Sequence, residues 1–95
     1  MSRLGKVSID LGAATDADML HHLLMEALKF PGWYGCNWDA FWDAITGLVE
    51  MPEVLEFTNW QGFAARLPNE SHLMRTCLEE MAQEFPASAS KVFYA

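Results

Sequence analysis

The sequence predicts one α/β domain in which a small three-stranded parallel sheet is flanked by about four helices. Three short segments have the residue pattern of strands, and the stretches between them have the periodicity of helices. Strands that are joined by helical crossovers pair in parallel, so this order favours a parallel sheet with the helices packed against it. The chain has 95 residues, about the size of one compact domain, and we expect a single domain over residues 1–95.

The predicted strands lie at the start, the middle and the end of the chain. Apolar and polar residues alternate over residues 6–11, which places the apolar side chains on one face. Two shorter segments, at residues 54–57 and 91–94, follow prolines and are rich in aromatic and branched apolar residues. We expect them to form the second and third strands.

The first two predicted helices lie between the first and second strands. Apolar residues recur at i, i+3 and i+4 over residues 19–28, after a turn at residues 12–16 that can supply an N-cap. Asn37 is a good N-cap for the second helix, which we expect to run to about Glu50 before Pro52 ends it.

The last two predicted helices lie between the second and third strands. The shorter one spans residues 60–67 and is followed by Pro68, and the longer one runs to about Glu84. The candidate N-caps are Thr58 or Asn59 for the shorter helix and Asn69 or Ser71 for the longer one.

Charge restricts the classes of partner. Thirteen acidic residues against six basic ones give a formal net charge of −7. The residues from Phe30 to Phe57 include five carboxylates and no Lys or Arg. A surface of this sign repels nucleic acid and acidic membranes and attracts basic proteins. The alternative is that these charges only keep the protein soluble.

The sequence also indicates where in the cell the protein is located. No apolar run approaches the roughly 18 residues that a membrane-spanning helix needs, and the first residues do not have the pattern of a signal peptide. Cys36 and Cys77 have neither metal-type spacing nor the density of a disulfide framework. We therefore expect a cytoplasmic protein with two reduced thiols and no membrane association.

The segment over residues 33–47 has the most informative chemistry. On a helical projection, one face of the second helix is apolar, the opposite face is acidic, and Trp42 lies at the boundary. The apolar face, which we assign to the core, consists of Trp38, Phe41, Ile45 and Leu48. The opposite face consists of Asp39, Asp43, Thr46 and Glu50.

Two features of this helix are unusual for a merely solvated surface. Asp39 and Asp43 form a like-charge i, i+4 pair, which costs about 0.2–0.5 kcal/mol, and no Lys or Arg lies at i±3 or i±4 to relieve it. Large aromatic rings are also dense between positions 33 and 42. Exposed aromatics beside unpaired carboxylates are typical of a binding site for a basic partner. The alternative is that all the rings belong to the core and the aspartates keep the helix soluble.

These residues resemble the central signature of the barstar family of ribonuclease inhibitors. The matching positions are Tyr34-Gly35, Asn37, Asp39-Ala40, Trp42-Asp43 and Thr46-Gly47. The order of predicted elements follows the family's layout over essentially the whole chain, which implies a barstar-like fold. The sequence departs from the family pattern at Trp33, Cys36, Trp38 and Leu48.

The resemblance implies a mechanism of inhibition. In this family the second helix and the loop before it enter the active-site cleft of a small basic ribonuclease, where carboxylates take the place of the RNA phosphate. By this resemblance Asp43 is the phosphate mimic and Asp39 forms a second ion pair. Trp33 and Trp42 are then aromatic anchors.

The resemblance also implies roles for the remaining site residues. Gly35 and Asn37 set the turn before the helix, Tyr34 belongs to the same binding loop, and Thr46 is a rim contact. Glu80 is the fourth-helix carboxylate that contributes, with Glu79 as the alternative. The implied partner is a basic ribonuclease or a related nuclease toxin in a 1:1 complex, with no cofactor, no metal and no direct binding of nucleic acid.

Two other classes compete with this interpretation. An enzyme could use a cysteine nucleophile with a histidine base, or the Asp39–Asp43 pair as an acid and base or as Mg²⁺ ligands. The candidate residues for the first are Cys36, Cys77, His21, His22 and His72, whose spacing fixes no dyad. The second class is an acidic interaction module whose partner is not a ribonuclease.

Overall fold

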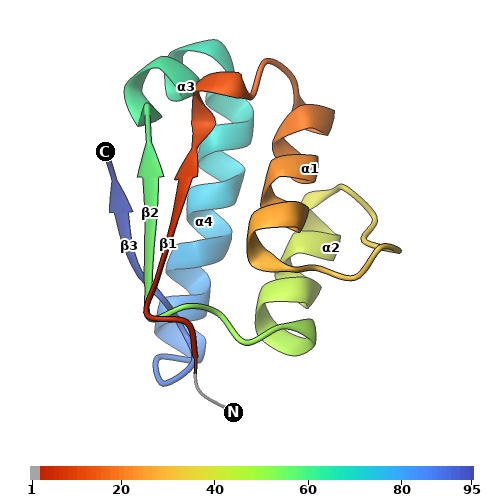
Figure 1. The fold of residues 1–95 in the computed structure, drawn as a ribbon, viewed down its shortest axis with the longest axis vertical. Coiled ribbons are helices and arrows are strands. Elements are labelled where there is room, and N and C mark those ends of the chain that lie inside the picture. Colours follow the sequence, from red (N-terminus) through yellow and green to blue (C-terminus); the bar gives the residue numbers. More distant parts are fainter. Residues whose placement is uncertain (1–2) are drawn as a thin grey trace.

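The computed structural model describes residues 3–95, in which three parallel strands form one sheet and the helices pack against it (Figure 1). The strands are β1 (Lys6–Asp10), β2 (Val54–Thr58) and β3 (Lys91–Tyr94), in the spatial order β1-β2-β3. The predicted α/β fold with a three-stranded parallel sheet is confirmed. No helix among residues 3–95 is both long enough and apolar enough to cross a membrane.

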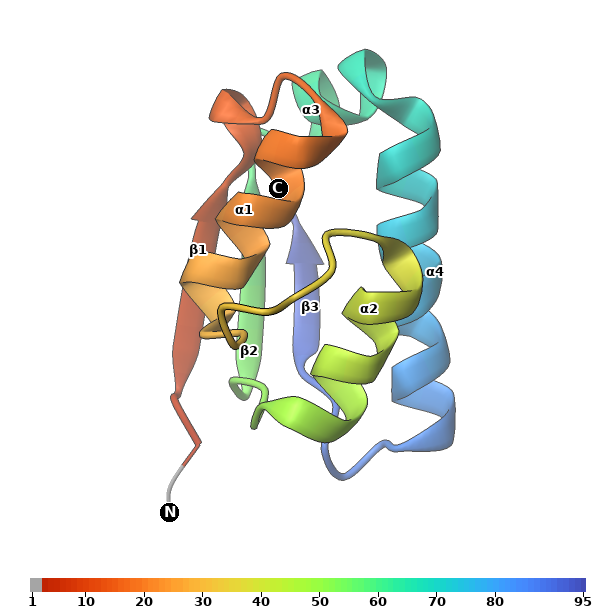
Figure 2. The same cartoon turned by 90° about the vertical axis from the view of Figure 1, so that its right-hand side faces the viewer.

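The helices cover one face of the sheet (Figure 2). The parallel register places Val7 opposite Leu55, and Ile9 opposite Phe57. Ile9, Leu55 and Phe57 are fully or almost fully buried. The other face carries polar side chains, among them Ser8 opposite Glu56. The core therefore lies between one side of the sheet and the helices.

Helix α1 (Ala17–Leu28) is capped as the sequence predicts. The carboxylate of Asp16 accepts a hydrogen bond from the Met19 amide at 2.8 Å, and the helix ends at Lys29 in the left-handed region, with φ of 64°. His21 lies on the buried face of α1 and His22 on its exposed face.

Of the N-caps predicted for the last two helices, Asn59 lies at the predicted position without a capping bond, and Asn69 and Ser71 are wrong. Asn59 precedes α3 (Trp60–Arg66), but it makes no capping bond; its amide donates to the Asp10 carboxylate at 2.6 Å instead. Helix α4 (Pro68–Glu84) begins at Pro68 rather than after Asn69 or Ser71. Proline suits this first position because its missing N–H would have no helical partner and its φ is already helical.

The second predicted helix has two parts. Helix α2 (Trp38–Asp43) continues into a π-helical turn, η2 (Ala44–Leu48), in which the amide of Val49 donates to the carbonyl of Ala44 at 3.1 Å. The helical segment thus ends near Leu48, not at Glu50. The assignment of Leu48 to the core is also wrong, since its side chain is 44% exposed. An extra residue in the π turn rotates Leu48 away from the apolar stripe of Trp38, Phe41 and Ile45.

Candidate functional site

Helices α2 and α4 lie side by side (Figure 2). Their side chains enclose an open hollow of about 520 Å³, which we call the acidic groove. Asp39, Asp43 and Glu80 place three carboxylates along it. The remaining lining residues are Trp38, Trp42, Leu73, Thr76 and Cys77. Apolar walls with charged groups at the edge are suited to holding a cationic side chain of another protein.

The cap of α2 fixes where this groove begins. The side-chain oxygen of Asn37 accepts a hydrogen bond from the Ala40 amide at 2.7 Å, while its amide group donates to the Gly35 carbonyl at 3.2 Å. A Cβ at Gly35 would lie 3.2 Å from the Asn37 amide nitrogen and 3.4 Å from the Ala40 Cβ. Gly35 therefore allows the close approach that lets Asn37 cap the helix and hold the preceding turn together.

Trp38 joins the first turn of α2 to two other helices. Its indole nitrogen donates to the Glu70 carboxylate on α4 at 3.1 Å, and its ring centroid lies 4.4 Å from that of His21 on α1. Phe41 packs against the edge of the same ring at 5.2 Å and is fully buried. The large side chain at position 38 thus serves to fix α2 in place, a role that its helical spacing alone could not reveal.

A buried polar pair supports the entry loop (residues 30–37), which leads into α2. The Tyr34 hydroxyl lies 2.6 Å from His21 Nδ1, and Tyr34 and His21 are only 7% and 2% exposed. Burial lowers the pKa of His21 and raises the pKa of Tyr34, so both side chains are neutral at pH 7. The phenol and the imidazole therefore share one hydrogen bond, and the Asn37 carbonyl at 3.5 Å is a second partner to which the phenol donates.

The two tryptophans that flank α2 differ in exposure. Trp33 is 73% exposed, the most exposed large hydrophobic residue of the described chain. Trp42 is half-buried, and its ring lies 6.4 Å from that of Phe85 at the end of α4. Trp33 therefore has most of its surface available to a partner, whereas Trp42 offers one edge.

The cations of the chain are held away from the acidic groove. Five of the six basic side chains contact groups elsewhere: Arg3 the Met51 carbonyl, Lys6 the Glu56 carboxylate, Arg66 the Leu11 carbonyl, Arg75 the Tyr94 ring and Lys91 the Phe93 ring. The ion pairs among residues 3–95 are Lys6–Glu56 and His22–Asp18, so Asp39, Asp43 and Glu80 have none. Burial is the main cause that raises the pKa of Cys77, and the negative charges of Glu80 and Asp39 raise it further. The groove is thus a site of negative potential.

The sequence matches a known protein family over most of its length. The profile of the family described as "Barstar (barnase inhibitor)" matches residues 5–95. The chain belongs to the barstar family. A protein of Bacillus subtilis (strain 168), described as "Putative ribonuclease inhibitor YrdF", is 39% identical over 56 residues, which are 59% of this chain and 62% of that protein. The family description is that of an enzyme inhibitor, not of an enzyme.

The structure separates the site residues that the barstar resemblance brought together. Asp39, Trp42, Asp43 and Glu80 line the acidic groove, whereas Glu79 lines a different hollow beside β3. Thr46 lies beyond the groove, where its hydroxyl donates to the Trp42 carbonyl at 2.6 Å. The side chain of Tyr34 is buried, and its contact with His21 holds the entry loop against α1.

The cysteines and histidines proposed for the competing enzyme do not form a site in the groove, whereas Asp39 and Asp43 both line it. Cys77 lies there without a histidine among the lining residues, and His21 is engaged by Tyr34. Within residues 3–95, one group of His, Cys, Asp or Glu side chains brings three ligand atoms within 4.8 Å of one another: Asp18, His22 and Cys36. That group lies outside the acidic groove.

Proposed function

We propose that this barstar-family protein inhibits a small basic ribonuclease by inserting α2 and the entry loop into the active site of the enzyme. The observation that supports this most strongly is the acidic groove, where Asp39, Asp43 and Glu80 lie together and form no ion pair with any cation of residues 3–95. Like charges held together without relief cost stability in the free protein. The cost is offset when a cationic partner occupies the groove.

In this proposal Asp43 takes the position of the RNA phosphate, and Asp39 and Glu80 pair with further cationic groups of the enzyme. A carboxylate that meets Arg, Lys or protonated His forms charge-assisted hydrogen bonds, which are about twice as strong as neutral ones. A binding site that receives RNA must itself be cationic, because RNA is a polyanion. The same field accelerates the encounter of inhibitor and enzyme and makes it sensitive to salt.

The remaining residues shape and anchor the interface. Trp33, which is 73% exposed, and the free edge of Trp42 are the aromatic anchors. Gly35 and Asn37 position the entry loop and the start of α2, and Thr46 is a contact at the rim. We place the protein in the cytoplasm, where it would protect a cell from a ribonuclease toxin as an immunity protein.

A titration of RNA cleavage tests the proposal. A panel of small basic ribonucleases cleaves a fluorogenic RNA while the wild-type chain, Asp43→Ala or Glu84→Ala is added. Glu84→Ala is the matched control, because it removes the same charge from an exposed position at the end of α4 outside the groove. We expect stoichiometric inhibition that weakens strongly for Asp43→Ala, weakens little for Glu84→Ala, and falls with added salt.

The other outcomes identify what is wrong. Equal inhibition by the wild type and Asp43→Ala would show that Asp43 does not contribute to inhibition. Stable 1:1 binding of a ribonuclease without loss of RNA cleavage would show an acidic interaction module rather than an inhibitor. Cleavage of RNA, or catalysis of another reaction, by the chain itself would show that the protein is an enzyme.

A further inference from the structure

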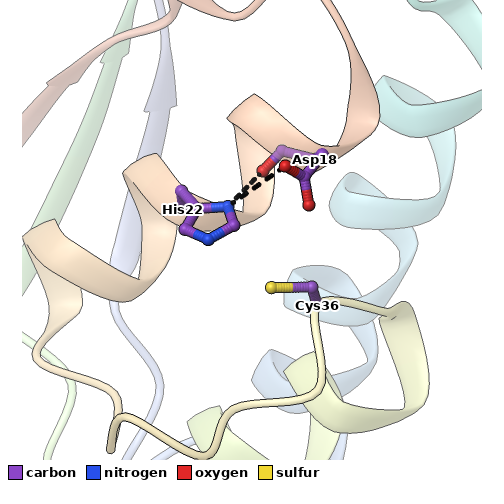
Figure 3. A group of neighbouring side chains, drawn as sticks. All are labelled: Asp18, His22 and Cys36. Atoms are coloured by element: carbon purple, nitrogen blue, oxygen red, sulfur yellow. Dashed lines mark hydrogen bonds and ion pairs between the residues drawn. The ribbon is translucent and has the colours of Figure 1, made fainter.

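Three potential metal ligands from two segments converge beside the entry loop (Figure 3). Asp18 and His22 lie one turn apart on the exposed face of α1, and Cys36 lies in the entry loop. The ligand atoms of the three side chains all lie within 4.8 Å of one another. Figure 3 shows that the three side chains face the same space between α1 and the loop.

The contacts of His22 orient its imidazole ring and leave one ring nitrogen free to bind a metal ion. Nδ1 lies 2.8 Å from the backbone carbonyl of Asp18, to which it can only donate, so the neutral ring keeps its lone pair on Nε2. An imidazole that is oriented by a hydrogen bond from its other nitrogen is the usual arrangement of a metal-bound histidine. The Asp18 carboxylate lies 3.6 Å from the same Nδ1 and is 80% exposed, so it must turn about its side-chain bonds toward Nε2 to share an ion with the ring.

We infer that Asp18, His22 and Cys36 bind a zinc ion, with water as the fourth ligand. A thiolate, an imidazole and a carboxylate are the three ligand types that zinc takes in proteins, whereas Mg²⁺ and Ca²⁺ prefer oxygen alone. Bond lengths of about 2.0–2.3 Å put tetrahedral ligands about 3.3–3.6 Å apart. The side chains need to approach by up to about 1.5 Å, which the exposed Asp18 and His22 can do by rotation about their side-chain bonds.

Binding would link the entry loop to α1. The free protein holds the loop to this helix from the inside through Tyr34 and His21, whereas an ion at Cys36 would hold it from the outside. An ion that binds only the folded arrangement stabilises it by an amount that grows with the logarithm of the ion concentration once that concentration exceeds Kd. The site shares no residue with the acidic groove, so the inference does not depend on the proposed inhibition.

The spectrum of bound cobalt tests the site. Untagged protein is titrated with Co²⁺, which occupies zinc sites and shows a thiolate-to-metal charge-transfer absorption in the near ultraviolet when a cysteine is bound. The variants are Cys36→Ser and His22→Gln, and the matched controls are Cys77→Ser and His72→Gln, which change the same residue types away from the cluster. Far-ultraviolet circular dichroism verifies that each variant is folded.

We expect one Co²⁺ per chain, the charge-transfer band in the wild type and in both controls, displacement by Zn²⁺ but not by Mg²⁺, and a zinc-dependent rise in Tm. Cys36→Ser should abolish the band, and His22→Gln should weaken zinc binding at least tenfold. The inference fails if the wild type shows no thiolate band or if Cys36→Ser keeps the zinc affinity of the wild type. It also fails if the band depends on Cys77, because the ion would then lie in the groove.

Discussion

Removal of the Tyr34 hydroxyl should destabilise the protein by leaving the buried Nδ1 of His21 without a partner. Tyr34→Phe keeps the ring and its packing 4.8 Å from Phe30, but it removes the hydroxyl that lies 2.6 Å from His21 Nδ1. A buried polar group that loses its partner costs about 1–3 kcal/mol. His21 is only 2% exposed, so water cannot replace the phenol without a rearrangement of the entry loop. We therefore expect a loss of about 2 kcal/mol from the free energy of unfolding.

A loss of this size is easy to measure in a domain of 95 residues. Each 1 kcal/mol shifts Tm by about 4–8 °C at this length, so Tyr34→Phe should lower Tm by about 8–16 °C. Urea unfolding, followed by tryptophan fluorescence and circular dichroism, gives the same quantity from the midpoint if the m-value is unchanged.

A double-mutant cycle separates the hydrogen bond from other effects. His21→Leu leaves the Tyr34 hydroxyl with only its 3.5 Å contact to the Asn37 carbonyl, so this variant is destabilised too. The combination with Tyr34→Phe removes both polar groups, and it should be less destabilised than the sum of the single variants by about 1 kcal/mol or more. A Tyr34→Phe protein within about 0.5 kcal/mol of the wild type, or an additive cycle, would refute the pairing.

Three further predictions follow from the contacts around the site. Gly35→Ala should destabilise by about 1–2 kcal/mol in urea unfolding, since its Cβ would crowd the Asn37 side chain at 3.2 Å; a neutral effect would contradict this account of the turn. Trp33→Ala should leave stability within about 0.5 kcal/mol of the wild type and yet weaken inhibition about tenfold or more, and a loss of stability instead would make Trp33 a structural residue. The amides of Asn59 and Gly12 lower the pKa of Asp10, so this carboxylate contributes stability above its ordinary pKa of 3.8 that is lost as the pH falls through the lowered value. Asn59→Gly, which tolerates the φ of 58° at this position, should therefore be less stable than the wild type at neutral pH, by a difference that shrinks in acid titrations; a difference independent of pH would exclude the Asp10 linkage.

The sequence was sufficient to predict the order of the elements and the parallel sheet. Both depend on local patterns, namely the alternation in strands, the helical spacing between them and the helix caps at Asp16 and Asn37. The same local reasoning was wrong at Leu48, because a π turn changes the phase of the helix without any marker in the residue pattern.

Other features of the site depend on packing between distant segments. The bond between Trp38 and Glu70 joins residues 32 positions apart, and no spacing rule indicates it. The burial of Tyr34 results from its partner on α1, although its place before an acidic helix suggested a surface residue. Cys36 lacks metal-type spacing in the sequence, and only the fold brings it to Asp18 and His22. The choice between Glu80 and Glu79 likewise depends on which side of α4 faces α2.

The most direct test of the central claim is the inhibition constant of Asp43→Asn, measured against a ribonuclease that the wild type inhibits, at low and high salt. Asparagine keeps the shape of the side chain and removes its charge. Loss of one member of a buried interfacial charge pair costs about 2–5 kcal/mol, a range borrowed from complexes that include those of this same family. We expect inhibition about 30- to 4,000-fold weaker than that of the wild type, with a smaller dependence on salt. An unchanged constant with unchanged salt dependence would contradict the claim that Asp43 stands in for the RNA phosphate.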